Sequence, residues 1–274
     1  MKVQTLFPEG KFKALTFSYD DGNVADRRLV EIFNRYGMKG TFNLCSFHLT
    51  GDNEGVIHQD EAPVLYRGHE IACHGTNHYM MERIPAMAAL DEIYSNRKQL
   101  ETMTGSVIGG FAYPYGTYSR QLISTLKTCG IKYARTVAST HSFSIPDDFL
   151  EWHPTCHHKE DLDAVGDRFL KWNWEPFTLL YVWGHAAEFS AGNNWDIMES
   201  FCRKMANQPD IWYATNMEIC RYVTAARQLE FSVDCTTVWN PSSQTIWFRY
   251  AAAGEWRIAA AAPGEETHLT PFDK

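Results

Sequence analysis

Strand-like and helix-like segments alternate along most of the chain, and this alternation restricts the fold more than any other feature of the sequence. The first unit has a β-favouring run over residues 12–19, a helix pattern over residues 23–37 that stops at Gly37, and a short strand over residues 38–45. Strand, helix and strand in so short a span form a βαβ unit, whose two strands run parallel.

The same alternation continues to about residue 229. Further strands are predicted over residues 68–74, 107–113, 131–137, 177–183 and 211–215, and further helices over residues 85–103, 119–129, 160–172, 195–206 and 217–229. Repeated units of this number favour an α/β barrel over a two-layer fold.

The final part of the chain changes character. Residues 229–238, 244–251 and 255–261 are β-like and are separated by turn-forming residues, which predicts a small antiparallel sheet. We therefore expect a barrel over residues 1–228 and a β-rich appendage over residues 229–274. The appendage would serve as a capping sheet or as a dimerisation surface, so a homo-oligomer is one expected state.

Composition excludes several classes of partner. The net charge is -8 and there is no long basic run, so we expect neither nucleic acid nor an anionic membrane surface as a partner. No stretch approaches the roughly 20 apolar residues that span a bilayer. The start lacks the pattern of a signal peptide, and the seven cysteines show no C-x-x-C spacing, which is typical of reduced thiols. These features predict a cytoplasmic protein.

Two adjacent carboxylates, Asp20 and Asp21, follow the first strand directly. Side chains of neighbouring strand residues point to opposite sides, so one carboxylate could bind a metal while the other stays free as a base. In barrels and open α/β sheets, the chemistry lies at the carboxyl ends of the parallel strands. Taken alone, the pair followed by Gly22 fits an ordinary turn better than a site, because Asp-Gly is a common turn dipeptide.

Three other predicted strands also end in polar motifs. His74 and His78 follow one of these strands and are four residues apart. This spacing predicts that both imidazoles lie on one face of a helical turn and bind one metal ion. The other two strands end in Tyr113-Pro114-Tyr115-Gly116 and in Trp183-Gly184-His185. A lone H-x-x-x-H pattern is usually two unrelated histidines, but the carboxylate pair and His185 at other strand ends support a site.

In this order, the segments T-F-S-Y-D-D-G, H-G-T-N-H, A-Y-P-Y-G and W-G-H resemble the polysaccharide deacetylase family, which has the NodB-homology domain of carbohydrate esterases. The resemblance covers roughly residues 12–220. It implies a distorted (β/α) barrel. It also implies a metal-dependent hydrolase that removes acetyl groups from a small N-acetylated or O-acetylated carbohydrate.

Carried over by motif, the resemblance assigns a role to each of several residues of this chain. It implies that the metal ligands are Asp21, His74 and His78, that Asp20 is the general base and that His185 is the general acid. It implies further that the backbone N–H of Tyr115 binds the oxyanion. We also expect substrate contacts from the motif residues Tyr113, Pro114 and Trp183.

The residues by themselves support a metal site of this kind. Two imidazoles and one carboxylate leave open positions on a divalent ion. We expect Zn²⁺, with Co, Ni, Mn or Fe as alternatives. Such an ion would acidify a bound water, Asp20 would accept its proton and His185 would protonate the departing amine.

One departure from the family pattern leaves alternatives open. The arginine that the family carries before the Tyr-Pro-Tyr segment is absent, so we expect Arg135, or one of His153, His157 and His158, to orient Asp20. Two rival functions remain. The first is hydrolysis of a non-sugar amide such as a cyclic ureide, although relatives of that kind tend to lose the metal histidines. The second is carbohydrate binding without catalysis around a structural metal, although a mere binder needs no base opposite an acid.

Overall fold

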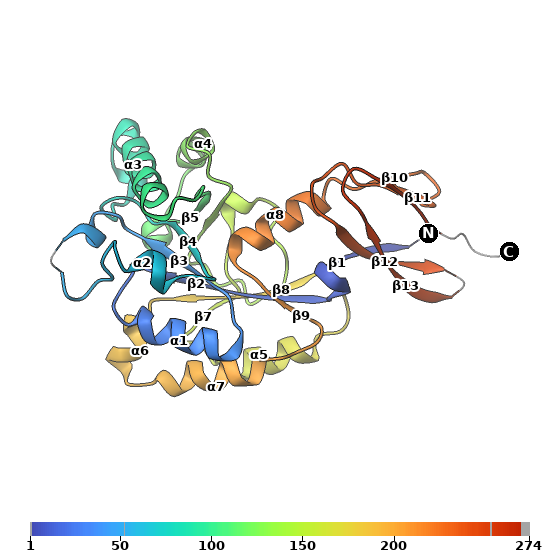
Figure 1. Cartoon of the computed structure of the whole chain (residues 1–274), viewed down its shortest axis with the longest axis horizontal. Coiled ribbons are helices and arrows are strands. Elements are labelled where there is room, and N and C mark those ends of the chain that lie inside the picture. The colour runs from blue at the N-terminus through green and yellow to red at the C-terminus, as the bar shows by residue number, and fades with distance from the viewer. Residues whose placement is uncertain (1, 52, 253, 270–274) are drawn as a thin grey trace.

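A curled parallel sheet forms the centre of the computed structural model, which describes residues 2–51, 53–252 and 254–269 (Figure 1). The strand order is β6-β5-β4-β3-β2-β8-β7. The strands of this sheet are β2 (Lys13–Asp20), β3 (Gly40–Leu44), β4 (Glu70–Cys73), β5 (Gly110–Ala112), β6 (Tyr133–Arg135), β7 (Cys156–His157), β8 (Thr178–Gly184) and β9 (Ile211–Tyr213). The predicted α/β fold class, a distorted (β/α) barrel, is confirmed.

Strand β2 organises this sheet. It pairs with β8 along one edge, while β9 takes the first half of its other edge and β3 takes the second half. Every residue of β2 and of β8 is buried, as expected for parallel strands that are covered on both faces. The carboxyl end of β2, which carries Asp20, therefore lies in the middle of the sheet.

An irregular segment links the two edges of the sheet. Trp152 bridges in parallel to Arg135 at the end of β6, and four residues later β7 pairs with β8. The segment 152–157 thus brings β6 and β8 into one hydrogen-bonded surface that surrounds the interior of the barrel.

Helices pack around the sheet (Figure 1). Those that the sequence predicts are α1 (Asp26–Tyr36), α3 (Ala86–Thr104), α4 (Arg120–Thr128), α5 (Leu162–Lys171), α7 (Trp195–Met205) and α8 (Asn216–Ala226). Helices α1 and α3 end at Gly37 and Gly105, which adopt the left-handed conformation at φ 68° and 65°. Thr215 and Glu218 form a capping box at the start of α8.

Several short elements were not predicted, because each spans little more than one turn. They are the helices α2 (Ala62–Leu65) and α6 (Ala187–Gly192) and the 3-10 turns η1 (Pro8–Gly10), η2 (His48–Thr50), η3 (Met81–Arg83), η4 (Pro114–Gly116) and η5 (Phe149–Glu151). No helix in the described part of the chain is long and apolar enough to cross a membrane.

The appendage consists of two three-stranded antiparallel sheets at one end of the molecule (Figure 1). One has the order β1 (Val3–Leu6), β12 (Ile246–Ala252), β13 (Glu255–Ala261), and the other has the order β10 (Glu230–Phe231), β11 (Thr237–Trp239), β14 (Glu266–His268). Residues 3–6 therefore pair with the C-terminal strands, which the sequence pattern did not predict. The division at residue 228 otherwise stays a prediction, and its outer ends, Met1 and residues 270–274, lie outside the described residues.

Candidate active site

Asp20 and Asp21 point in different directions at the end of β2. Asp20 is directed into the barrel and its side chain is 3% exposed, whereas that of Asp21 is 42% exposed. Asp21 and Gly22 adopt positive φ angles of 78° and 64°, so the chain turns sharply after the strand. The expected division of the pair into a buried and an accessible carboxylate is present.

A buried ion pair holds Asp20. Arg135 Nη2 lies 2.6 Å from Asp20 Oδ1 and 2.5 Å from Oδ2, and Asn43 Nδ2 donates to Oδ1 at 2.8 Å. Burial alone would raise the pKa of Asp20, but the guanidinium of Arg135, together with His74 and His185, holds it below its ordinary value. Asp20 is therefore ionised at neutral pH. Among the expected alternatives, Arg135 is the residue that contacts it.

His74 is held in one tautomer. Its Nδ1 lies 2.8 Å from the carbonyl oxygen of Ala112, which can only accept, so Nδ1 carries the hydrogen. In the neutral ring the Nε2 lone pair then faces Asp21 Oδ1 at 3.6 Å and Asp20 Oδ2 at 3.8 Å. The nitrogen lone pair and the two carboxylate oxygens are all acceptors, and none of them carries a hydrogen to donate to the others. A cation between them would interact favourably with all three. The donor set therefore fits a divalent metal.

The predicted helical turn between His74 and His78 is wrong. The segment is an irregular loop in which Gly75 and His78 adopt φ angles of 80° and 60°. Glu92 of α3 fixes it, because its carboxylate accepts hydrogen bonds from Asn77 N at 2.8 Å and from Asn77 Nδ2 at 2.5 Å. This loop places His78 Nε2 at 3.7 Å from Asp21 Oδ1. Burial and the neighbouring His74 lower the pKa of His78, which favours the neutral ring that metals bind.

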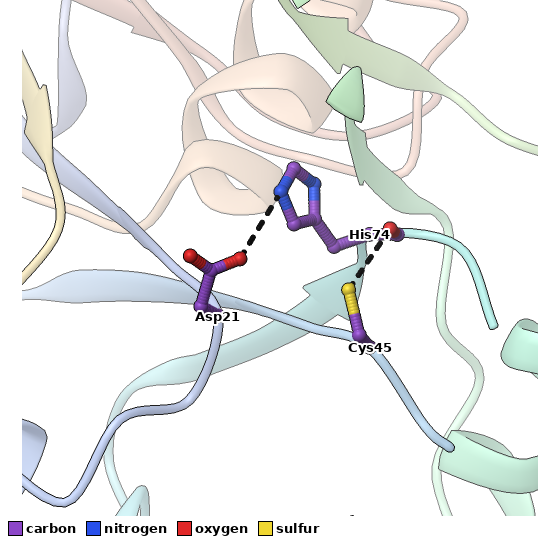
Figure 2. A group of neighbouring side chains, drawn as sticks. All are labelled: Asp21, Cys45 and His74. Carbon is purple, nitrogen blue, oxygen red and sulfur yellow. Dashed lines mark hydrogen bonds and ion pairs between the residues drawn. The ribbon is translucent and has the colours of Figure 1, made fainter. Parts of the chain in front are cut away.

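One group of potential metal-ligand atoms includes a residue that the sequence pattern did not predict. Ligand atoms of Asp21, Cys45 and His74 all lie within 4.8 Å of one another (Figure 2). Cys45 thus occupies the place in this group that was expected for His78, although both histidines contact Asp21. The signal was available in the sequence, because Cys45 directly follows a strand, β3, as Asp21 and His74 do.

His185 approaches the two aspartates from the opposite side. Its Nε2 lies 3.9 Å from Asp20 Oδ2 and 3.9 Å from Asp21 Oδ2, and its Nδ1 is directed at Glu188 Oε1, 3.7 Å away. Lys159 Nζ donates to the same oxygen of Glu188 at 2.7 Å. Burial opposes ionisation of Glu188, but the hydrogen bond from Lys159 and the charges of the nearby histidines lower its pKa. An ionised carboxylate therefore faces Nδ1 of His185, while Nε2 of the same ring faces the two aspartates.

A second group of potential ligand atoms consists of those of His157, His185 and Glu188. His157 Nδ1 accepts from the N–H of Lys159 at 3.1 Å, so the hydrogen of the neutral ring is on Nε2, 3.2 Å from Glu188 Oε2. His158 Nε2 lies 2.9 Å from the same oxygen. Ring nitrogens of both histidines thus lie beside the carboxylate of Glu188.

The three predicted substrate contacts, Tyr113, Pro114 and Trp183, are all buried in the structure. Tyr113 is 1% exposed and its hydroxyl donates to the carbonyl of Leu150 at 2.9 Å, so it is a core residue. Pro114 is also buried. Trp183 is 8% exposed and its ring packs against the guanidinium of Arg135 at 4.5 Å, so it supports the partner of Asp20. Tyr115 differs from these, because its side chain is 53% exposed and its φ is 60°. Its role as oxyanion donor stays a prediction.

A further buried carboxylate, Asp26, lies behind the site. Its Oδ2 bonds the hydroxyl of Tyr66 at 2.7 Å, and its Oδ1 has no partner among the described residues. Burial raises the pKa of Asp26 to about 8. The unfolded chain would lose this proton near its ordinary pKa of about 3.9. Because the folded state keeps the proton longer, the contribution of Asp26 to stability is complete below pH of about 4 and is lost as the pH rises to about 8.

We therefore expect the variant Asp26→Asn to flatten the pH dependence of folding stability. Between pH 5 and 7, the free energy of unfolding of the wild type should fall relative to that of the variant by up to about 1.4 kcal/mol per pH unit. Urea denaturation at several pH values measures this difference. A wild-type-to-variant difference that stays constant over this range would show that Asp26 is ionised in the folded protein.

The fold and the site together define a (β/α) barrel with a cluster of carboxylates and histidines at the carboxyl ends of its parallel strands. Residues 8–134 match the family model described as polysaccharide deacetylase. The family that the motifs predicted is therefore confirmed over these residues, which include both aspartates, both histidines of the loop and Tyr115. None of the curated proteins matches the chain.

Several solved structures share the fold of this chain. A polysaccharide deacetylase, described as putative, from Mycobacterium smegmatis has a TM-score of 0.61 and 16% sequence identity, covering 82% of this chain and 94% of its own. A mutant of the peptidoglycan deacetylase PdaC from Bacillus subtilis has a TM-score of 0.54 and 18% identity, with 81% and 97% covered. The Xyl-CE4 domain of a multidomain xylanase from the hindgut metagenome of Trinervitermes trinervoides has a TM-score of 0.54 and 16% identity, with 78% and 92% covered. At these identities the likeness supports the fold.

Proposed function

We propose that the protein is a metal-dependent hydrolase that removes acetyl groups from an N-acetylated or O-acetylated carbohydrate. The observation that carries the proposal is the arrangement around His74 Nε2. Its lone pair faces the carboxylate of Asp21, the ionised Asp20 lies on one side, and His185 lies 3.9 Å from both carboxylates. A cation site flanked by a base and an acid is what hydrolysis of an acyl bond requires.

Asp21, His74 and His78 would hold the metal. When bound there, a divalent ion polarises the acyl carbonyl and acidifies a water molecule. Asp20 would accept the proton of this water at Oδ2, because Oδ1 already accepts from Asn43 and both oxygens contact Arg135. The ion pair with Arg135 keeps Asp20 ionised and in one rotamer. It fixes the position of the carboxylate but makes Asp20 a weaker base.

His185 would protonate the leaving nitrogen or oxygen. Its Nε2 faces the site, while Nδ1 is directed at the ionised Glu188. A carboxylate in this position stabilises the protonated ring and keeps its orientation, as in other histidine–carboxylate pairs. The proton therefore moves from Nε2, the nitrogen that points away from Glu188.

Acetate release tests the activity. The purified protein, supplied with Zn²⁺ or Co²⁺, should release acetate from small N-acetylated or O-acetylated sugars. Simple N-acetylated amines without a sugar ring serve as the comparison. Release from the amines but not from the sugars would contradict the carbohydrate part of the proposal, and release from neither would contradict the activity.

Metal content tests the site without any assumption about substrate. We expect about one divalent ion per wild-type chain, and His78→Ala should lose metal affinity by orders of magnitude because one of three proposed ligands is gone. Native mass spectrometry measures both. His141→Ala, in an exposed loop, is the control and should keep its metal. Undiminished metal in His78→Ala would remove His78 from the ligand set.

A further inference from the structure

Cys45 is placed by strand β3 on the same side as the residues that support the base. Side chains alternate along a strand, so Asn43 and Cys45 share one side. Asn43 reaches Asp20 Oδ1 at 2.8 Å, which shows that this side faces the interior of the barrel below the site. Cys45, two residues nearer the carboxyl end, is fully buried. Its thiol is therefore directed to the site from the protein side and not from solvent.

The surroundings of the thiol consist of potential metal ligands. Sγ lies within 4.8 Å of a ligand nitrogen of His74 and of a carboxylate oxygen of Asp21 (Figure 2). Its present hydrogen bond goes to the carbonyl oxygen of His74 at 3.2 Å, and a sulfur donor makes such bonds only weakly. An independent feature points to a cation in the same space, namely the almost fully buried Nε2 of His74, whose lone pair faces two carboxylates.

We infer that Cys45 is a thiolate ligand of the metal centre, beside Asp21 and His74, a role that rests on the metal site of the proposed function. On coordination the S–H bond breaks, the sulfur–metal bond forms and the proton leaves to solvent. The thiol approaches from the buried side, whereas the side chains of Asp21 and His78 are partly exposed. Cys45 would therefore reach a bound ion from the protein side of the site.

A sulfur ligand changes which metal the site selects. Thiolates favour Zn²⁺ and other soft or borderline ions, whereas Mg²⁺ and Mn²⁺ prefer oxygen ligands.

Cobalt substitution tests the inference by spectroscopy. The wild-type protein loaded with one Co²⁺ per chain should show a sulfur-to-cobalt charge-transfer band in the near ultraviolet. Cys45→Ser and Cys45→Ala should lack this band. Cys73→Ser is the matched control, since Cys73 is equally buried at the end of the neighbouring strand β4 and is not in the donor group; it should keep the band.

Zinc binding provides a second measurement. Loss of the ligand should weaken Zn²⁺ binding by at least the roughly 10–100-fold that is typical of changes around a site. X-ray absorption of the zinc-loaded wild type requires no variant, and it should show one sulfur at about 2.3 Å with nitrogen and oxygen ligands at about 2.0–2.2 Å.

The outcomes separate this inference from the proposed function. One cobalt per chain with no charge-transfer band, or a zinc shell without sulfur, would overturn the role of Cys45 and leave the deacetylase proposal intact. A wild-type protein that binds no divalent ion would overturn both. A band that persists in Cys45→Ala would assign the sulfur to another cysteine.

Discussion

Asp20→Asn is expected to lower kcat by about 10²–10⁴-fold while the protein keeps its metal, because the change removes the proposed base and none of the proposed ligands. Asparagine has nearly the same shape, and its carbonyl oxygen can still accept from Arg135. The active-site geometry should therefore survive. Turnover of acetylated sugar by the metal-loaded variant, with metal content measured on the same sample, checks this expectation.

A matched control for this variant is Asp161→Asn. Asp161 caps α5 by accepting from Ala164 N at 3.0 Å, and asparagine caps helices about as well. This control should keep wild-type turnover and metal. If Asp20→Asn also turned over substrate at the wild-type rate, Asp20 would not be the base.

Arg135→Met is expected to destabilise the folded protein by about 3–5 kcal/mol, because it leaves the carboxylate of Asp20 buried without its partner. Arg135 is wholly buried and Asp20 is 3% exposed, so water cannot replace the lost guanidinium. In the wild type, the lowered pKa of Asp20 adds stability above its unfolded pKa of about 3.9, and this stability is lost as the pH falls through the lower folded value. In Arg135→Met, the stability that ionised Asp20 adds to the folded state should vanish, or the buried charge should destabilise the folded state instead.

Urea denaturation of Arg135→Met measures the effect, and the double variant Arg135→Met with Asp20→Asn separates its cause. Without a charge at position 20, the arginine should matter less, so the double variant should be more stable than the sum of the two single effects predicts. A loss of less than about 1 kcal/mol in Arg135→Met would mean that the ion pair is not the main support of Asp20. Additive effects would mean that the two side chains act independently.

The chemistry at the strand ends could be predicted from the sequence because it depends on local rules. Alternating strands and helices imply parallel strands, whose carboxyl ends meet, and this rule alone predicts that Asp20, His74 and His185 lie close together. The sequence offered four candidates for the partner of Asp20, and no local pattern distinguished among them. These were Arg135, His153, His157 and His158. Arg135 and Asp20 belong to β6 and β2, which are not neighbours in the sheet, and they meet only because the curled sheet encloses its interior.

The loop between His74 and His78 was predicted wrongly for a different reason. A spacing of four fits a helical turn, but positive φ angles at Gly75 and His78 and the hydrogen bonds from Asn77 to Glu92 define another conformation. The tertiary contact with α3 overrides the local pattern there. Likewise, β1 has only four residues, and its pairing with β12 joins opposite ends of the chain, which no local pattern records.

The segment 152–158 has a consequence for how such an enzyme can diverge. At one end, this segment bridges to β6, which carries Arg135. At the other end, it supplies His157 and His158, which lie beside Glu188, the carboxylate that faces His185 Nδ1. An insertion or deletion here would displace the neighbours of the proposed base and of the proposed acid in a single mutational step.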